Sequence, residues 1–462
     1  MNRQIDRRRF LSQMGVATAV SGFASSSAAL HGRQGAGRPN FIIILSDDQG
    51  YEDLGCFGSR TIRTPRLDAM AEQGLRLTSF YSQPVCGPAR TALMTGCYPM
   101  RVGRPWDGWS LPGEETTVAE VLKGAGYDTC CIGKWDLSLR QEVEDRLPNS
   151  QGFDYYLGTL GANDRGRCML WRNREKLYET SDMGSLTGLY TEEAIRHLRE
   201  KRSAPFFLYL AHTMPHVQLG ASERFRGRSK AGLYGDVIEE LDDSVGRLMD
   251  TLKEQGLDKN TIVLYFSDNG PWLIKGDQGG SSRPLRDGKG SSWEGGFRVP
   301  AIFWGPGKIP AGRTSNSMMA SLDILPTFAA LANTRPPSNR KIDGLDQSRF
   351  ITGQSPTSSR ETFYYYVGST LHAVRKGKWK LAIPSGRMGR AYIMDQTPLV
   401  APELYDLETD ISESKNLANE KPDVVADLLN LVEEARRDIG DKAAPGEGAR
   451  NLPDQPGEES RK

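Results

Sequence analysis

The sequence predicts an α/β fold: a large mixed, mostly parallel sheet sandwiched by helices, followed by a small C-terminal α+β subdomain. Two observations predict this class. Short apolar runs alternate with amphipathic helical patterns along most of the chain, which is typical of strand–helix–strand units. With 462 residues the chain also exceeds the usual size of one domain, so a smaller appended unit is expected.

The elements of the large sheet are expected to alternate between strand and helix. Five apolar runs have the length of buried strands, and four segments show helical periodicity that ends at Gly, Asn or a polar turn. The expected strands cover residues 41–45, 128–132, 205–210, 261–266 and 299–304. The expected helices cover residues 67–73, 117–123, 237–253 and 322–332.

The composition changes after residue 334, because Pro, Ser and Arg dilute the apolar pattern over 334–339 and again around 353–359. We therefore expect a large domain over residues 39–350, the subdomain over 360–440, and a disordered tail over 442–462. The subdomain is expected to contain short strands at 363–367, 372–374, 379–383 and 404–407, then one helix at 422–439.

The first thirty residues have the pattern of a signal peptide. Arg7-Arg8-Arg9-Phe10-Leu11 precedes a weakly apolar stretch and the small pair Ala28-Ala29, which resembles a twin-arginine signal. The stretch is too short and too rich in Ser and Gly to span a membrane, which takes roughly twenty apolar residues. This predicts export by the twin-arginine machinery to the periplasm or the extracellular space, without stable membrane association; a basic disordered tail is the alternative.

The overall charge excludes one class of partner. The formal net charge is only +1, so the chain carries no excess of basic residues for binding nucleic acid. Hydrophobic residues make up 38% and charged residues 25%, which is ordinary for a globular enzyme and argues against a fibrous or wholly disordered protein.

Polar residues follow four of the expected strands at the point where each strand ends. Because ligands of an open parallel sheet bind beyond the carboxyl ends of its strands, these residues are expected to meet in one site. They are Asp47, Asp48, Lys134, Asp136, His212, His216, Asp268 and Asn269.

Four of these residues, Asp47, Asp48, Asp268 and Asn269, offer only oxygen ligands. Hard carboxylate and amide oxygens favour Ca²⁺ or Mg²⁺ over zinc, so we expect a Ca²⁺ site, with Mg²⁺ as the other candidate. Consecutive strand residues point to opposite faces. The two neighbouring aspartates can therefore reach one ion only if the chain leaves β geometry there, which the Gln-Gly turn after them permits.

Cys86 lies just before a helix that Pro88 is expected to open, and Arg90 follows one turn later. The start of a helix favours anions, because its first N–H groups and its dipole are directed at them. Such a position would stabilise both a negatively charged nucleophile and a tetrahedral oxyanion. The alternative is that the cysteine is simply a small buried residue.

The residues from Cys86 to Arg90 match the signature Cys-x-Pro-Ser/Ala-Arg. The chain thereby resembles a type I, formylglycine-dependent sulfatase of the arylsulfatase kind, in the alkaline phosphatase superfamily. The resemblance spans roughly residues 39 to 440. Its further motifs lie at residues 47–50, 133–135, 216, 267–270, 288–290 and 293–296.

The resemblance implies that a formylglycine-generating enzyme oxidises Cys86 to formylglycine, whose hydrated aldehyde supplies the attacking hydroxyl. It also implies that Asp47, Asp48, Asp268 and Asn269 bind the metal ion. In the family this ion also contacts the modified cysteine and a sulfate oxygen.

The resemblance further implies the roles of the basic residues. Arg90 and Lys134 would stabilise the hydrate as its alkoxide forms. Lys289 and His216 would bind the sulfate and the bridging oxygen, and one of them would help to protonate the leaving alcohol. Asp268 would take the proton of the attacking hydroxyl. His212, four residues before His216, is either a substrate contact or a structural histidine.

Two positions depart from the family pattern. Asp136 stands where the family usually has His, and Cys97 stands where an Arg is common. A carboxylate cannot donate a hydrogen bond unless it is protonated, so Asp136 puts the step that expels sulfate in question. Two alternatives stay open: a phosphodiesterase or phosphonate hydrolase on the same scaffold, and a noncatalytic protein that binds sulfated glycans.

The expected substrate is a sulfated polysaccharide or its oligosaccharides, with a small aryl or alkyl sulfate as the alternative. Tryptophan faces and arginines suit sugar rings and sulfate groups. The candidate recognition residues are Trp106, Trp109, Trp171, Trp272 and Arg283.

Overall fold

The computed structural model describes residues 37–104, 110–138, 144–385, 392–395, 397–442 and 444–450. The expected signal peptide at 1–30, Trp106 and Trp109 lie outside these residues. The chain from Arg38 onward forms one compact unit. Within the described part, no helix combines the length and the apolar composition that a membrane crossing requires.

The large sheet predicted from the sequence is present, and all five expected strands belong to it. Among the described residues it has eleven strands in the order β10-β2-β9-β8-β1-β7-β3-β4-β5-β6, with β11 paired to β2. Strands β8, β1, β7, β3 and β4 are parallel. The strands are β1 Asn40–Ser46, β2 Leu75–Tyr81, β3 Asp128–Lys134, β4 Tyr155–Thr159, β5 Cys168–Arg172, β6 Glu175–Thr180, β7 Phe206–Ala211, β8 Thr261–Ser267, β9 Arg298–Trp304, β10 Arg313–Ser315 and β11 Met319–Ala320.

One expected strand, β9, runs antiparallel to both of its neighbours, β8 and β2. The carboxyl end of β9 therefore lies at the opposite edge from the carboxyl ends of β1, β3, β7 and β8. Its beginning lies at their edge instead. The segment before β9, which ends in the short helix α6 (Glu294–Phe297), consequently arrives at the edge where the polar residues were expected to meet.

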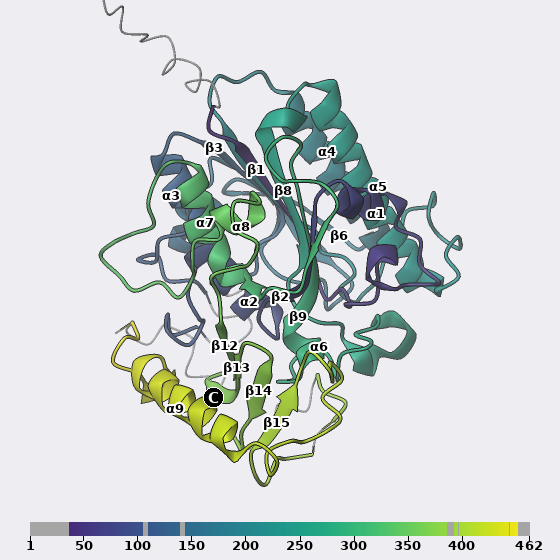
Figure 1. Cartoon of the computed structure of the whole chain (residues 1–462). Coiled ribbons are helices and arrows are strands. Elements are labelled where there is room, and N and C mark those ends of the chain that lie inside the picture. Colours follow the sequence, from purple (N-terminus) through teal and green to yellow (C-terminus); the bar gives the residue numbers. More distant parts are fainter. Residues whose placement is uncertain are drawn as a thin grey trace, which may run out of the picture. The chain divides into compact units, whose positions relative to one another are not determined.

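Helices cover both faces of the sheet, as predicted (Figure 1). Because successive strand residues point to opposite faces, Ile42 and Ile44 of β1 pack in one apolar core and Phe41, Ile43 and Leu45 in the other. The first core includes α1 (Pro65–Glu72), α4 (Leu186–Arg199) and α5 (Gly232–Glu254). The second includes α2 (Cys86–Thr95), α3 (Val118–Gly124), α7 (Ile324–Leu331) and α8 (Ser348–Ile351).

The expected α+β subdomain is a four-stranded antiparallel sheet in the order β12-β13-β14-β15, with α9 (Pro422–Asp438) packed on it (Figure 1). Its apolar core also takes in Tyr81 at the end of β2, and Trp293 and Phe297 just before β9. The subdomain therefore packs against the edge of the large sheet at which the site residues meet. Its strands are β12 Thr362–Val367, β13 Thr370–Lys376, β14 Trp379–Ala382 and β15 Glu403–Asp406.

Residues 444–450 are structured, although the sequence predicts a disordered tail from residue 442. Strand β16 (Gly440–Asp441) pairs with β17 (Ala444–Pro445). The backbone N–H of Arg450 donates to the carbonyl of Arg101 at 2.7 Å, and its guanidinium pairs with Glu115. These long-range partners hold a segment whose own composition of Pro, Gly and charge predicts no structure, and residues 451–462 lie outside the described part.

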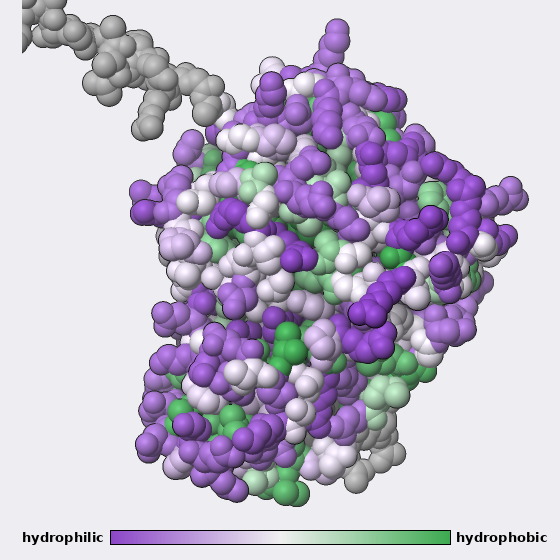
Figure 2. Space-filling view, turned by 45° about the vertical axis from the view of Figure 1, so that its right-hand side comes forward, coloured by the Kyte–Doolittle hydropathy of each residue, from purple (hydrophilic) through white to green (hydrophobic). Residues whose placement is uncertain are grey.

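The surface is ordinary for a globular protein. On the face drawn in Figure 2, hydrophilic side chains predominate and strongly hydrophobic residues occur in small, separate groups.

Candidate active site

Cys86 occupies the first position of α2, and every residue of this helix is buried. The sequence predicts that Pro88 opens the helix just after the cysteine. In the structure the helix begins two residues earlier, and Pro88 lies in its first turn, where a missing N–H costs no hydrogen bond. The cysteine thus stands at the positive end of the helix dipole, which favours an anionic group bound there.

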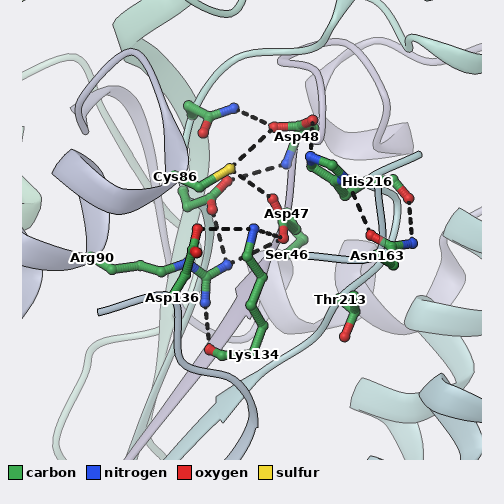
Figure 3. Close-up of polar contacts among 12 residues, drawn as sticks. Ser46, Asp47, Asp48, Cys86, Arg90, Lys134, Asp136, Asn163, Thr213 and His216 are labelled. Atoms are coloured by element: carbon green, nitrogen blue, oxygen red, sulfur yellow. Dashed lines mark hydrogen bonds and ion pairs between the residues drawn. The ribbon is translucent and has the colours of Figure 1, made fainter. Parts of the chain in front are cut away.

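The thiol of Cys86 lies among charged groups (Figure 3). Its Sγ is 3.2 Å from Asp47 Oδ1, 3.8 Å from Asp48 Oδ1 and 3.5 Å from Lys289 Nζ. Burial, and after it the charge of Asp47, raises the pKa of the thiol well above its usual value. A thiol held in its neutral form is a poor nucleophile.

The two aspartates after β1 both face this thiol. Asp48 has a φ of 66°, in the left-handed region, so the chain leaves β geometry between them as the sequence predicts. The backbone N–H of Asp48 donates to Asp268 Oδ1 at 3.1 Å, which fixes the turn against the end of β8. One ligand atom each from Asp47, Asp48, Cys86 and His216 lies within 4.8 Å of the others.

Asn269 completes an oxygen-rich set of side chains. Its Nδ2 donates to Asp48 Oδ1 at 2.7 Å, whereas its buried Oδ1 has no hydrogen-bond partner among the described residues. A buried amide oxygen without a donor costs free energy unless a cation or water satisfies it. The orphaned oxygen beside Asp47, Asp48 and Asp268 therefore fits a hard divalent ion such as Ca²⁺ or Mg²⁺.

Three buried cations surround the carboxylates. Lys134 Nζ lies 2.7 Å from Asp47 Oδ2, and Lys289 Nζ lies 2.7 Å from Asp48 Oδ1. Arg90 Nη2 is 2.9 Å from Asp268 Oδ2, and its Nη1 donates to the backbone carbonyl of Lys134 at 2.7 Å. The end of β3, the second turn of α2 and the segment before β9 thus each contribute one positive charge.

The carboxylates of the site have unequal proton affinities. Burial opposes the ionisation of Asp47, but Lys134, His216 and Arg90 together hold the pKa of its carboxyl below the usual range. Burial and the neighbouring charge of Asp47 raise the pKa of Asp268 to about 7. Like charges this close are destabilising without further positive charge, which again fits a cation at this position.

His216 is fixed through one ring nitrogen. Its Nδ1 lies 2.6 Å from the carbonyl oxygen of Val217 and 3.1 Å from Asn163 Oδ1, so Nδ1 is the position that donates. Its Nε2 lies 3.6 Å from Asp48 Oδ2 and 3.6 Å from Asp164 Oδ1, on the side of the carboxylates (Figure 3). Burial lowers the pKa of the ring.

Asn163 is a site residue that the sequence analysis missed. It donates through Nδ2 to the backbone carbonyl of His216 at 3.1 Å, so it holds that loop as well as the ring. It follows β4, whose residues end in Gly158 and Thr159 and so do not form a continuous apolar run that would indicate a strand. The rule that site residues follow strands would have found Asn163 had β4 been recognised.

His212 lies away from the site, so the prediction of a substrate contact is corrected and its structural alternative holds. Its Nε2 is 3.3 Å from the hydroxyl of Ser244 on α5, and its ring lies 6.3 Å from that of Tyr190 on α4. Burial lowers the pKa of this ring to about 3. The side chain of His212 therefore points towards α4 and α5, on one face of the sheet, rather than towards the strand ends where Cys86 lies.

Asp136 joins the site through Lys134. Its Oδ2 lies 3.5 Å from Lys134 Nζ, and both side chains are fully buried (Figure 3). Asp136 has a φ of 55°, a conformation that Asp, Asn and His adopt more readily than most residues. The ammonium group of Lys134 therefore lies between two carboxylates, those of Asp47 and Asp136.

Aromatic rings lie beside His216 and Lys289. The ring of Trp272 is 5.6 Å from that of His216, and Lys289 Nζ is 4.6 Å from its centroid. The ring of Tyr392 lies 5.3 Å from Trp272 and 5.5 Å from Lys289 Nζ. Tyr392 belongs to the C-terminal part of the chain, and no local sequence signal connects it with Trp272.

The other recognition candidates within the described residues lie elsewhere. Trp171 is buried in the apolar core on one face of the sheet. Arg283 is largely exposed and pairs with Glu52 at 2.8 Å.

Two family models match most of the chain. Residues 39–334 match the model described as sulfatase, and residues 358–452 match the model described as the C-terminal region of aryl-sulfatase.

The chain is also similar to individual proteins that carry related names. It is 38% identical over 388 residues to N-acetylgalactosamine-6-sulfatase of Canis lupus familiaris, which covers 77% of this chain and 73% of that protein. It is 35% identical over 446 residues to arylsulfatase A of Homo sapiens, with 85% and 87% covered. The crystal structure of the PsFucS1 sulfatase from Pseudoalteromonas sp. superposes with a TM-score of 0.77 at 27% identity, and covers 88% of this chain and 91% of that one.

Proposed function

The chain belongs to the sulfatase family and hydrolyses sulfate esters, and on this premise we propose that formylglycine made from Cys86 is its nucleophile and that Ca²⁺, or Mg²⁺ in its place, is bound beside it. The observation that carries this proposal is the convergence of three buried carboxylates and three buried cations around one thiol at a helix start. A formylglycine-generating enzyme is the partner that the modification requires.

Five side chains would hold the ion: Asp47, Asp48, Asp268, Asn269 and the modified residue 86. The buried Oδ1 of Asn269 supports this set, because it has no hydrogen-bond donor among the described residues and a cation would satisfy it. When bound, the ion would supply positive charge that polarises a sulfate oxygen and the attacking hydroxyl. The hydrated formylglycine would supply that hydroxyl.

The basic side chains bind and orient the sulfate group. Sulfuryl transfer spreads negative charge over the equatorial oxygens, so fixed positive charges stabilise its transition state. Lys289, 3.5 Å from Cys86 Sγ, is positioned to contact a sulfate oxygen. Lys134 and Arg90, which pair with Asp47 and Asp268, stabilise negative charge as it forms on the hydroxyl of residue 86.

His216 and Lys289 are the candidates for protonating the leaving alcohol. Because Nδ1 of His216 donates to the carbonyl of Val217, its Nε2 faces the bridging oxygen. Nε2 can donate a proton only when the ring is an imidazolium, a form that the nearby charge of Asp48 favours. Asp48, which lies within 4 Å of both His216 Nε2 and Lys289 Nζ, keeps the two groups on the same side. Asp268 remains our candidate for accepting the proton of the attacking hydroxyl.

Asp136 takes the position of the family histidine, and we assign it a role through Lys134. Its carboxylate, 3.5 Å from the ammonium group, favours the charged form of Lys134 and orients it. This role needs no proton donation by Asp136, so the substitution is compatible with turnover.

The substrate class that we propose is a sulfated polysaccharide or oligosaccharide. The rings of Trp272 and Tyr392 lie next to the two groups that would contact the bridging oxygen, where the sugar of a sulfate ester would lie. Aromatic faces stack on the apolar faces of sugar rings. One similar protein is named for a sulfated amino sugar, which supports the same class.

Two measurements on the purified protein test the proposal. Mass spectrometry of the tryptic peptide 77–90 should show the mass loss of the thiol-to-aldehyde conversion, and an unmodified thiol in active protein would contradict it. Sulfate release should then be measured on a panel of sulfated sugars, an aryl sulfate and the matching aryl phosphate. Faster hydrolysis of the phosphate would favour the phosphodiesterase alternative, and binding without any turnover would favour a noncatalytic glycan-binding protein.

We also propose that residues 1–30 direct export by the twin-arginine machinery to the periplasm or beyond. The triple arginine followed by Phe10 and Leu11 supports this. Protein isolated from the periplasm should lack the leader, and its N-terminal peptide, read by mass spectrometry, checks this. An intact leader on periplasmic protein would contradict the proposal.

A further inference from the structure

A second polar cavity lies apart from the site around Cys86. Its volume is about 750 Å³, and it lies between the large sheet and the C-terminal subdomain. Ser79 of β2, Arg298 of β9 and Asn316 line it on one side, and Arg375 of β13 and Lys378 line it on the other. Two exposed carboxylates, Glu361 and Glu408, also belong to the lining. None of its lining residues contacts Cys86.

One buried cation next to this cavity, Arg375, makes no ion pair with any described residue. Lys380 lies 2.7 Å from Glu413 and 3.2 Å from Glu294, and Arg298 lies 3.5 Å from Glu294. Arg375 has no carboxylate within 4 Å among the described residues; its guanidinium donates to the hydroxyl of Tyr81 and to a backbone carbonyl. Glu294 acts on Arg375 only at longer range, and Lys380 and Arg298 already contact that carboxylate.

The other cations of the cavity are already paired. Arg360 binds Asp323 through both nitrogens of its guanidinium edge, with the shortest distance 2.6 Å, and Lys378 pairs with Asp406 at 2.6 Å. Neither their carboxylates nor the exposed Glu361 and Glu408 of the lining make an ion pair with Arg375. A buried charge without a contacting counter-charge is costly, and the adjoining cavity offers space for one.

The chemistry of the lining selects the class of ligand. Guanidinium groups bind tetrahedral and planar oxyanions through two parallel N–H donors, and the hydroxyl of Ser79 and the amide of Asn316 add neutral donors. We propose that this cavity is an oxyanion site in which Arg375 and Arg298 hold a sulfate group. The sulfate group is either free inorganic sulfate or a sulfate carried on a glycan chain.

The test measures binding rather than turnover, so its outcome does not depend on the proposed reaction. The full-length double variant Cys86→Ala/Lys289→Met serves as the background, because it weakens sulfate binding at the reaction site. Isothermal titration with inorganic sulfate, and separately with a sulfated oligosaccharide and its desulfated counterpart, gives the affinity. Circular dichroism and thermal unfolding check that each variant is folded.

Two added substitutions remove the site in different ways. Arg375→Met removes the buried charge that has no ion pair, and we expect sulfate to bind about tenfold more weakly, since charge-assisted hydrogen bonds to a desolvated anion are strong. Asn316→Asp is nearly isosteric, lies at an exposed position of the lining and adds a negative charge, so it tests the proposal even if the arginine variant does not fold. Asn430→Asp, exposed on α9 and outside the lining, is its matched control.

The ligands distinguish the two sources. If inorganic sulfate binds and both Arg375→Met and Asn316→Asp weaken its binding, the cavity is a site for the free ion. Binding of only the sulfated oligosaccharide, with the same sensitivity, supports a site for a glycan-borne sulfate group. Absence of sulfate and oligosaccharide binding, or binding that Arg375→Met and Asn316→Asp leave as strong as Asn430→Asp does, overturns the proposal.

Discussion

Single residues decide whether the charged groups of the site can meet. The left-handed backbone at Asp48 turns its carboxylate to the same side as that of Asp47, so both reach Cys86. Lys289 then contacts Asp48 and the thiol together. Because these distances are short and the groups are buried, changes of one side chain at this scale should affect catalysis far more than stability.

Lys289→Met should lower kcat on an aryl sulfate by about two to three orders of magnitude, because a fixed charge at the forming oxyanion is lost. Steady-state kinetics with unchanged circular dichroism measures this. Lys275→Met is the matched control, since its ammonium group contacts Trp272 at 4.3 Å but is not among the groups that contact the thiol. A fall in kcat of less than tenfold for Lys289→Met would show that this lysine does not stabilise the transition state.

Asp136→Asn should lower kcat by about tenfold, because the neutral amide supports the charge of Lys134 less well. Asn tolerates the left-handed backbone of this position, so thermal unfolding should change little. The same substitution at Asp145, which is largely exposed, should have no effect on kcat. Equal rates for wild type and Asp136→Asn would mean that this carboxylate takes no part in the reaction.

Trp272→Ala should raise KM for a sulfated oligosaccharide by about fivefold, since one stacking surface for the sugar is lost. The same variant should bind a small aryl sulfate with a smaller change in KM, and this comparison within one protein controls for damage to the site. Michaelis–Menten kinetics on both substrates measures the difference. An equal rise in KM for both substrates would show that Trp272 maintains the structure of the site and does not contact the sugar.

At the scale of elements, the direction of β9 brings Lys289, of the motif at residues 288–290, to the site. Lys289 and α6 precede β9, and they reach the carboxyl edge because β9 is antiparallel. The subdomain holds the segment before β9 through two hydrogen bonds. Lys380 of β14 donates to the carbonyl of Ser292 at 2.9 Å, and Glu413 accepts from the N–H of Glu294 at 2.8 Å. The subdomain is therefore part of the support of the active site.

The charge state of this support should make stability depend on pH. Burial, with some opposition from Lys380, raises the pKa of Glu413 to about 7, above its usual value of 4.5. A group whose pKa is higher in the folded state binds protons on folding, so its contribution is full below pH 4.5 and is lost as the pH rises through about 7. The free energy of unfolding should therefore decrease between pH 5 and 8 on this account.

Glu413→Gln should make the free energy of unfolding fall less steeply between pH 5 and 8, because the amide does not titrate. Differential scanning calorimetry of both proteins at several pH values measures it. The partly exposed Glu433 provides the control substitution Glu433→Gln, which should leave the wild-type slope intact. The same slope in Glu413→Gln as in the wild type would assign the pH dependence to other groups.

At the scale of the whole molecule, folding gathers charges that are scattered over more than 240 residues of sequence. Asp47 and Asp48 follow β1, Asp268 and Asn269 follow β8, and Lys289 precedes β9, yet all lie at one edge of one sheet. Repulsion among the carboxylates lowers the stability of the folded protein, and a bound cation would offset this repulsion. The folded protein should therefore be more stable with the ion than without it.

Removal of divalent ions with a chelator should lower the midpoint of thermal unfolding, and added Ca²⁺ should restore it, because the ion binds only the folded chain. Asp48→Asn should abolish most of this response, whereas the exposed Asp250→Asn should keep it. Thermal scans with chelator, with Ca²⁺ and with Mg²⁺ also rank the two ions. A midpoint that does not respond to the chelator or to added Ca²⁺ would contradict a metal site at Asn269.

Local patterns in the sequence determined the class of fold and most of the site. The five apolar runs specified buried strands, and the polar residues that follow four of them include Asp47, Asp48, Lys134, Asp268 and Asn269. This works because the position after a buried strand is set by the strand itself. The motif at Cys86 and the turn after Asp47 are likewise short-range features.

Tertiary structure alone decided which of the predicted residues face one another. His212 and His216 lie four residues apart, yet one packs against α5 and the other faces Asp48. The reversed direction of β9 and the approach of Tyr392 to Trp272 are also absent from any local pattern. The physical reason is that strand direction and cross-domain contacts depend on the burial of surfaces far apart in the chain, and no short segment encodes that burial.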